Sequence, residues 1–134
     1  MAGSAITQAL TVNGMGDDLN AVSKQLKLSW TGDDATGAVP TLAIAEFGGW
    51  WLTKVVTNPG AVPPTAAYDI TLMDADGADL ADGALLDRSR TLTEVETMAV
   101  QVPAAGFTFT MTGNTDASAV GTCELYFNKD ARGW

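Results

Sequence analysis

The chain has 134 residues, of which 46% are hydrophobic and 17% are charged, and its formal net charge is −9. This balance predicts a folded domain with its own core and excludes an intrinsically disordered chain. The seven basic residues are scattered along the sequence, so the chain lacks the basic patch of a nucleic-acid-binding protein, and an anionic membrane surface would repel it.

Histidine is absent and Cys123 is the one cysteine. Without histidine the chain cannot assemble a Ser-His-Asp or Cys-His catalytic site or a histidine-ligated metal site. A single cysteine allows no intrachain disulfide, and its alternation with Leu125 and Phe127 places it in the core. We therefore expect no catalytic residues, no enzymatic activity and no cofactor.

The first residues, Met-Ala-Gly-Ser-Ala, lack the charged start and apolar stretch of a signal peptide. No apolar run has the length needed to cross a bilayer, so we expect synthesis in a cytoplasm. The chain is interpreted as a single β domain over residues 1–134, with a short flexible N-terminal arm (1–5) and a C-terminal tail (129–134).

Apolar residues alternate with polar ones along most of the chain, and turn residues interrupt the alternation. A period of two is typical of half-buried strands. The expected strands cover residues 5–12, 22–30, 41–47, 50–57, 68–73, 91–102, 107–112 and 120–128. The sequence thus predicts an all-β fold, an antiparallel β-sandwich or a β-tulip or jelly-roll-like barrel of about seven to eight strands.

Three connections between these strands carry specific expectations. Gly48-Gly49 is a two-residue hairpin signal between 41–47 and 50–57, and a polar loop at 113–118 makes a second hairpin of the last two strands. The stretch from Asp79 to Arg90 is ambiguous. A short helix is one interpretation, which Gly83 weakens.

Trp50 and Trp51 are adjacent, so in a strand they point to opposite faces. Strict alternation groups Trp50 with Val56 and Trp51 with Val55. A strand that is apolar on both faces is either central or covered by another chain. Trp51, Val55 and Trp134 are therefore our interface candidates, and we expect a homo-oligomer, with a trimer favoured.

The segment Asp74-Ala-Asp-Gly-Ala-Asp resembles part of a calcium loop, with Asp74, Asp76 and Asp79 as weak candidate ligands. An EF-hand needs an acid at the twelfth position, where this chain has Leu85. Asp-Gly is also a strong turn signal. A hairpin turn is the favoured interpretation, so no metal site is assigned.

Glu94 and Glu96 would share one face of a strand. Paired carboxylates facing one cleft perform glycoside hydrolysis, but exposed acids on an acidic protein explain this pair better. Arg88 is expected to pair with an aspartate of the preceding loop: Asp74, Asp76 or Asp87.

Two stretches, together about half of the chain, resemble small β-sandwich virion structural proteins of tailed bacteriophages, of the head decoration (cement) type. The first, residues 57–89, contains Thr-Asn-Pro-Gly, Pro-Pro-Thr, Tyr-Asp-Ile-Thr-Leu, Asp-Ala-Asp-Gly-Ala-Asp and Asp-Arg-Ser. The second combines Gly-Phe-Thr-Phe-Thr-Met, from Gly106, with residues 121–127. The resemblance brings no functional residues with it.

This resemblance implies a virion protein that is assembled in the host bacterial cytoplasm. It implies a capsid decoration protein that binds and stabilises the outer shell, with the major capsid protein or other virion proteins as partners. A tail, neck or adsorption component is an alternative. A glycan-binding module that stacks sugars on Trp50, Trp51 or Trp134 is another.

Overall fold

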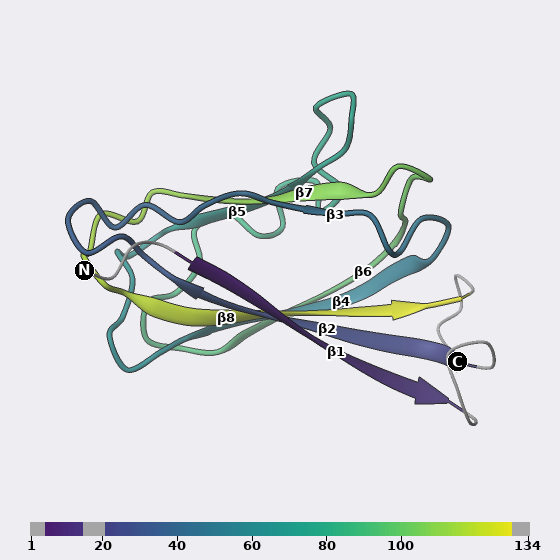
Figure 1. The fold of residues 1–134 in the computed structure, drawn as a ribbon, viewed down its shortest axis with the longest axis horizontal. Coiled ribbons are helices and arrows are strands. Elements are labelled where there is room, and N and C mark those ends of the chain that lie inside the picture. The colour runs from purple at the N-terminus through teal and green to yellow at the C-terminus, as the bar shows by residue number, and fades with distance from the viewer. Residues whose placement is uncertain (1–4, 15–20, 130–134) are drawn as a thin grey trace.

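The computed structural model describes residues 5–14 and 21–129. Over these ranges the chain forms eight strands and no helix (Figure 1). The strands are β1 (Ala5–Gly14), β2 (Ala21–Thr31), β3 (Leu42–Ile44), β4 (Trp51–Pro59), β5 (Asp69–Met73), β6 (Glu94–Gln101), β7 (Phe107–Thr112) and β8 (Val120–Asn128). Apart from Ala5 and Lys129, the predicted arm and tail lie outside the described residues.

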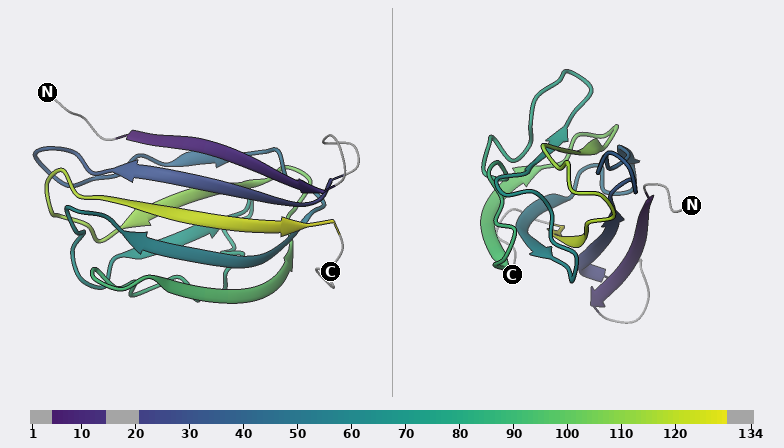
Figure 2. Two further views of the ribbon diagram at one scale, coloured as in Figure 1. Left: turned by 90° about the horizontal axis from the view of Figure 1, so that it is seen from below. Right: turned by 90° about the vertical axis from the view of Figure 1, so that its left-hand side faces the viewer.

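The strands form two antiparallel sheets that pack face to face, so the all-β sandwich prediction is confirmed. The larger sheet has the order β1-β2-β8-β4-β6, and the smaller one has the order β3-β7-β5. Figures 1 and 2 show the two layers, with the strands of the larger sheet running along the long axis. A search of the described residues for an apolar helix of membrane-spanning length finds none.

The space between the sheets is filled by the inward members of each alternating strand. Phe47 stacks on Phe127, with ring centroids 3.9 Å apart, and Trp30 packs at a tilt against Tyr68, with centroids 6.0 Å apart. Cys123 is fully buried in this core, as its alternation predicts. Burying such side chains is the main source of folding free energy, at roughly 25 cal/mol for each Å² of apolar surface.

Both predicted hairpins are wrong. The chain crosses from the small sheet to the large one between β3 and β4, and again between β7 and β8. In each case the two strands belong to different sheets instead of pairing edge to edge. Apolar alternation gives the same pattern for both arrangements, because the inward face is apolar in each.

The short helix considered for the 79–90 stretch is also wrong, because this stretch is a series of turns. Asp82 and Gly83 have positive φ values of 49° and 80°, which a right-handed helix does not allow. The Asp79 carboxylate accepts backbone N–H groups from Leu72, Ala81 and Gly83 at 3.0–3.1 Å. It thereby ties these turns to β5.

A bulge in β4 changes which of its side chains reach the core. The register shifts between Leu52 and Lys54 against both neighbouring strands. Thr53 is the extra residue against β8, whereas against β6 the extra residue lies on β6, between Thr97 and Val100. As a result Leu52 and Val55, three positions apart, are both fully buried. The interface prediction for Val55 is therefore wrong. Val56 takes the outward position that strict alternation assigned to Val55.

Arg88 is buried, with 2% of its surface exposed, and it does not bind the aspartates expected from the sequence. Its guanidinium forms ion pairs with Glu94 at 3.0 Å and Glu96 at 3.2 Å. It also donates to the carbonyl oxygen of Ala84 at 2.8 Å, while its backbone N–H donates to the carbonyl oxygen of Tyr68 at 2.7 Å. The predicted shared face of Glu94 and Glu96 is confirmed, and it points inward, toward Arg88.

This buried guanidinium gives a stability prediction. Replacing Arg88 with Ala leaves two half-buried glutamates without their cation and should lower the free energy of unfolding by about 3 kcal/mol, the lower end for a broken buried pair. Urea denaturation followed by tryptophan fluorescence measures the loss. Arg90→Ala is the matched control, because Arg90 is exposed and donates to the Pro64 carbonyl oxygen. Equal losses in the two variants would contradict the assigned role of Arg88.

Candidate functional site

A groove of about 370 Å³ lies on the larger sheet, where β2, β4, β6 and β8 run side by side. Its lining includes two ammonium groups, hydroxyl groups, an amide and two aromatic rings. The residues are Ser23, Lys24, Thr53, Lys54, Thr97, Tyr126, Phe127 and Asn128. A concave surface with such convergent polar groups is the usual setting of a small-ligand site.

The β4 bulge shapes the floor of this groove. The Thr53 hydroxyl donates to the carbonyl oxygen of Tyr126 at 3.2 Å, and the Asn128 amide donates to the Thr53 hydroxyl at 3.1 Å. These contacts anchor the extra residue to β8. The bulge therefore holds a hydroxyl and an amide in fixed positions on the sheet surface.

Lys54 and Tyr126 are opposite each other in the β4–β8 register. The Lys54 ammonium lies 4.3 Å from the centre of the Tyr126 ring, a favourable cation–π distance. The ion pairs found among the described residues both involve Arg88, so this ammonium is placed by a ring and not by a carboxylate. It keeps its capacity to donate hydrogen bonds to a ligand.

Glu124 binds the hydroxyl group of Tyr126. The Tyr126 hydroxyl donates to Glu124 at 3.0 Å, and Gln25 donates to the same carboxylate oxygen at 3.1 Å. Partial burial, together with this hydrogen bond and the charge of Glu124, raises the pKa of Tyr126. The phenol therefore stays neutral at physiological pH, and its ring keeps one orientation beside Lys54.

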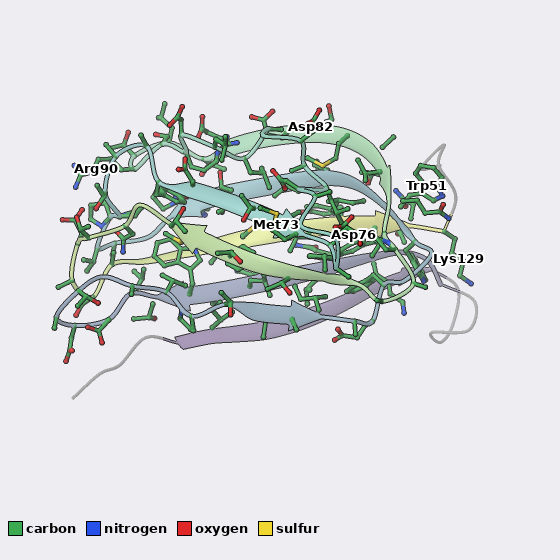
Figure 3. All side chains as sticks on the ribbon, turned by 90° about the horizontal axis from the view of Figure 1, so that it is seen from above. Trp51, Met73, Asp76, Asp82, Arg90 and Lys129 are labelled. Carbon is green, nitrogen blue, oxygen red and sulfur yellow. The ribbon has the colours of Figure 1, made fainter. Side chains whose placement is uncertain are left out.

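Trp51 does not line the groove, but it is the β4 register partner of Asn128, which does. Trp51 precedes the inward-pointing Leu52, so its half-buried side chain faces outward, and its register partners are Asn128 and Gln101. Figure 3 shows Trp51 at the same end of the sandwich as Lys129. Trp51 thus places an aromatic surface next to the polar lining of the groove.

The other two tryptophans considered above are placed differently. Trp50 packs edge-on against Phe47, with centroids 6.5 Å apart, and Lys24 lies 4.8 Å from the centre of its ring. Trp50 therefore packs at the edge of the hydrophobic core. Trp134 lies outside the described residues.

The calcium candidates are part of a hydrogen-bonded turn. Asp74 accepts the backbone N–H groups of Asp76 and Ala78, both at 2.9 Å, and Asp79 binds the backbone as described above. Across residues 5–14 and 21–129, no three acidic, histidine or cysteine side chains are grouped to hold a metal ion. The carboxylates of this turn are used to fix its own backbone.

Lys54, Tyr126, Thr53 and Asn128 were not identified from the sequence. The outward position of Tyr126 can be read from alternation, whereas strict alternation places Lys54 on the same face as Trp50 and Val56, and the bulge turns it outward. The groove itself depends on the bulge and on the neighbouring positions of β4 and β8, which the one-dimensional pattern does not show.

Comparisons with known proteins give little beyond the fold. No family model matches the chain, and no curated protein matches it. A solved structure that matches is the enzymatically active domain of tailspike protein 4 of bacteriophage CBA120, with 14% sequence identity and a TM-score of 0.30. The match covers 94% of this chain but 18% of the tailspike chain, so this chain spans less than a fifth of that length.

This comparison bears on two expectations, one of which it contradicts. The matched protein belongs to a phage tail and not to a capsid, so the likeness gives no support to head decoration. The matched domain is also described as enzymatically active, which contradicts the expectation that the chain is not an enzyme. That expectation is withdrawn. A TM-score of 0.30 transfers no activity to this chain either.

A buried thiol and a buried phenol predict how the free energy of unfolding depends on pH. Burial raises the pKa of the Cys123 thiol and of the Tyr68 phenol, each to about 12. The Tyr68 hydroxyl has no hydrogen-bond partner within the described residues, and the nearby Thr57 hydroxyl has only a minor, opposite effect on its pKa.

Because both groups lose their protons more readily in the unfolded chain, the free energy of unfolding should fall as pH rises from about 9 toward 12. Urea denaturation at a series of pH values measures this slope. In Cys123→Ala the decline should be shallower and begin nearer pH 10, where free tyrosine ionises. A slope unchanged by the substitution would show that the thiol does not contribute.

Proposed function

We propose that the protein is a tail, neck or adsorption component of a tailed-phage virion, and that it binds saccharide through the groove beside Trp51 and Lys54. The observation that carries this proposal is the lining of that groove. A virion origin is supported by the sequence resemblance of residues 57–89, 106–111 and 121–127 to small phage structural proteins.

The groove has the groups that a sugar ring requires. The apolar face of a pyranose packs on an aromatic surface, which Trp51 provides, while its hydroxyl groups need fixed donors and acceptors. Thr53 and Asn128 are held in place by hydrogen bonds to each other and to β8. Lys54 adds a charged donor on the same wall.

The same lining favours adsorption over head decoration. A decoration protein needs surfaces that fit the capsid shell, and a solvent-facing groove with ligand-type groups adds nothing to that task. A protein that contacts the host cell needs such a groove. Bacterial cell surfaces are rich in polysaccharide, and many weak sugar contacts from a multivalent particle add up to firm attachment.

Immunogold labelling of intact virions with antibodies against the purified chain tests the location. We expect gold particles at the tail or neck. Label distributed over the capsid surface would overturn the proposal in favour of decoration.

Binding of the fluorescently labelled chain to host cells tests the groove. Trp51→Ala should weaken binding by about tenfold or more, as expected when a central aromatic side chain worth over 1.4 kcal/mol is removed. Lys54→Gln should weaken it in the same direction. Lys27→Gln is the matched control, since Lys27 is an exposed lysine of β2 outside the groove.

Equal binding by Trp51→Ala, Lys54→Gln and the unmodified chain would contradict the groove assignment. Equal losses of binding in Lys54→Gln and Lys27→Gln would show that Lys54 acts only through its contribution to the net charge.

A further inference from the structure

The groove beside Lys54 is lined by cations and not by acids. The chain has 16 acidic residues and 7 basic ones, yet none of the described residues that line the groove is acidic. Two of the four lysines, Lys24 and Lys54, are part of the lining. Neither belongs to the ion pairs found within residues 5–14 and 21–129, which both involve Arg88. The lining therefore has a positive charge that no carboxylate of its own cancels.

Aromatic rings position the ammonium groups of both lysines. The Lys54 nitrogen lies 4.3 Å from the centre of the Tyr126 ring, and the Lys24 nitrogen lies 4.8 Å from the centre of the Trp50 ring. A ring attracts a cation through its quadrupole, and it leaves the three N–H donors of an ammonium group without an oxygen acceptor. Lys54 can therefore donate to an anionic ligand without first losing an ion pair.

The carboxylate on the outward face of β8 does not compete for Lys54. Glu124 lies two residues before Tyr126, and one of its oxygens accepts from the Tyr126 hydroxyl at 3.0 Å and from the Gln25 amide at 3.1 Å. It thus meets the hydroxyl end of the ring, whereas the Lys54 ammonium lies over the ring itself. The geometry leaves Lys54 available although an acid is bound to the same tyrosine.

We propose that the saccharide bound by this groove is acidic, with a carboxylate or phosphate group that accepts hydrogen bonds from the Lys54 ammonium. This inference rests on the proposed function, because it names the substrate class of the same groove. Thr97 is opposite Lys54 in the β4–β6 register and also lines the groove, so its hydroxyl can donate to the same anion. Hydrogen bonds between ionised groups are about twice as strong as neutral ones, so an acidic sugar is preferred over its neutral counterpart.

The net charge of −9 opposes this binding only at long range. Much of the negative charge lies on β5 of the smaller sheet and in the turns that follow it, in Asp69, Asp74, Asp76, Asp79, Asp82 and Asp87. At physiological ionic strength, exposed charges more than about 8 Å apart are largely screened from each other. A direct hydrogen bond from Lys54 is much shorter than that and persists.

Host-cell polysaccharide with and without its acidic groups tests this inference. Polysaccharide extracted from the host surface competes with cells for the fluorescently labelled chain at physiological salt. One portion is untreated, a second has its carboxyl groups reduced to alcohols, and a third has its phosphate groups removed, all at equal sugar content and matched chain length. We expect the untreated portion to compete about tenfold better than at least one treated portion. The portion that loses competition identifies the acidic group as carboxylate or phosphate.

Three variants assign the preference to one side chain. Lys54→Gln should bind the untreated and treated portions equally, while Lys54→Arg, which keeps the positive charge, should retain the preference. Lys27→Gln is the matched control and should also retain it, because Lys27 lies outside the groove. A preference that persists in Lys54→Gln would overturn the assignment.

The competition separates this inference from the function on which it rests. If all three portions compete equally well, the groove binds saccharide but not through an acidic group, and the inference alone is wrong. If the untreated polysaccharide does not compete at all, the proposed saccharide binding is wrong and this inference is wrong with it.

Discussion

The buried ion-pair cluster of Arg88 with Glu94 and Glu96 is the interaction on which much of this structure depends. Arg88 follows a run of turns and is hydrogen-bonded to the backbone of Tyr68 and Ala84, so its guanidinium joins that run to β6. The same contacts draw both half-buried glutamates toward the core. A single cation therefore holds an irregular segment in place against the last strand of the sheet.

Sequence alternation was sufficient to locate strands but not to pair them. The last two strands were predicted as 107–112 and 120–128, the same bounds that β7 and β8 have in the structure. Their pairing was predicted wrongly because inward side chains are apolar in both arrangements, whether two strands are paired within one sheet or lie in two opposing sheets. The Val55 error has a different cause, since one extra residue, Thr53, reverses the phase of every later position in β4.

The candidate site was only partly accessible from sequence. Trp51 was recognised because two adjacent tryptophans cannot share a face. Arg88 was matched with nearby aspartates, but the Asp74 carboxylate already binds backbone N–H groups of its own turn. The glutamates that bind Arg88 lie on a strand whose inward face was not known beforehand. Local spacing cannot show such a competition between backbone and side-chain donors.

The position of β8 in the larger sheet bears on how the protein is made. β8 lies between β2 and β4 and contacts both along nearly its full length, yet it is the last of the eight described strands to be synthesised. While the ribosome is still translating, these two strands lack their common neighbour and the sheet remains in two pieces. Sandwiches dominated by such distant pairings fold in milliseconds to seconds, so the nascent chain exposes unpaired edges until residue 128 has emerged.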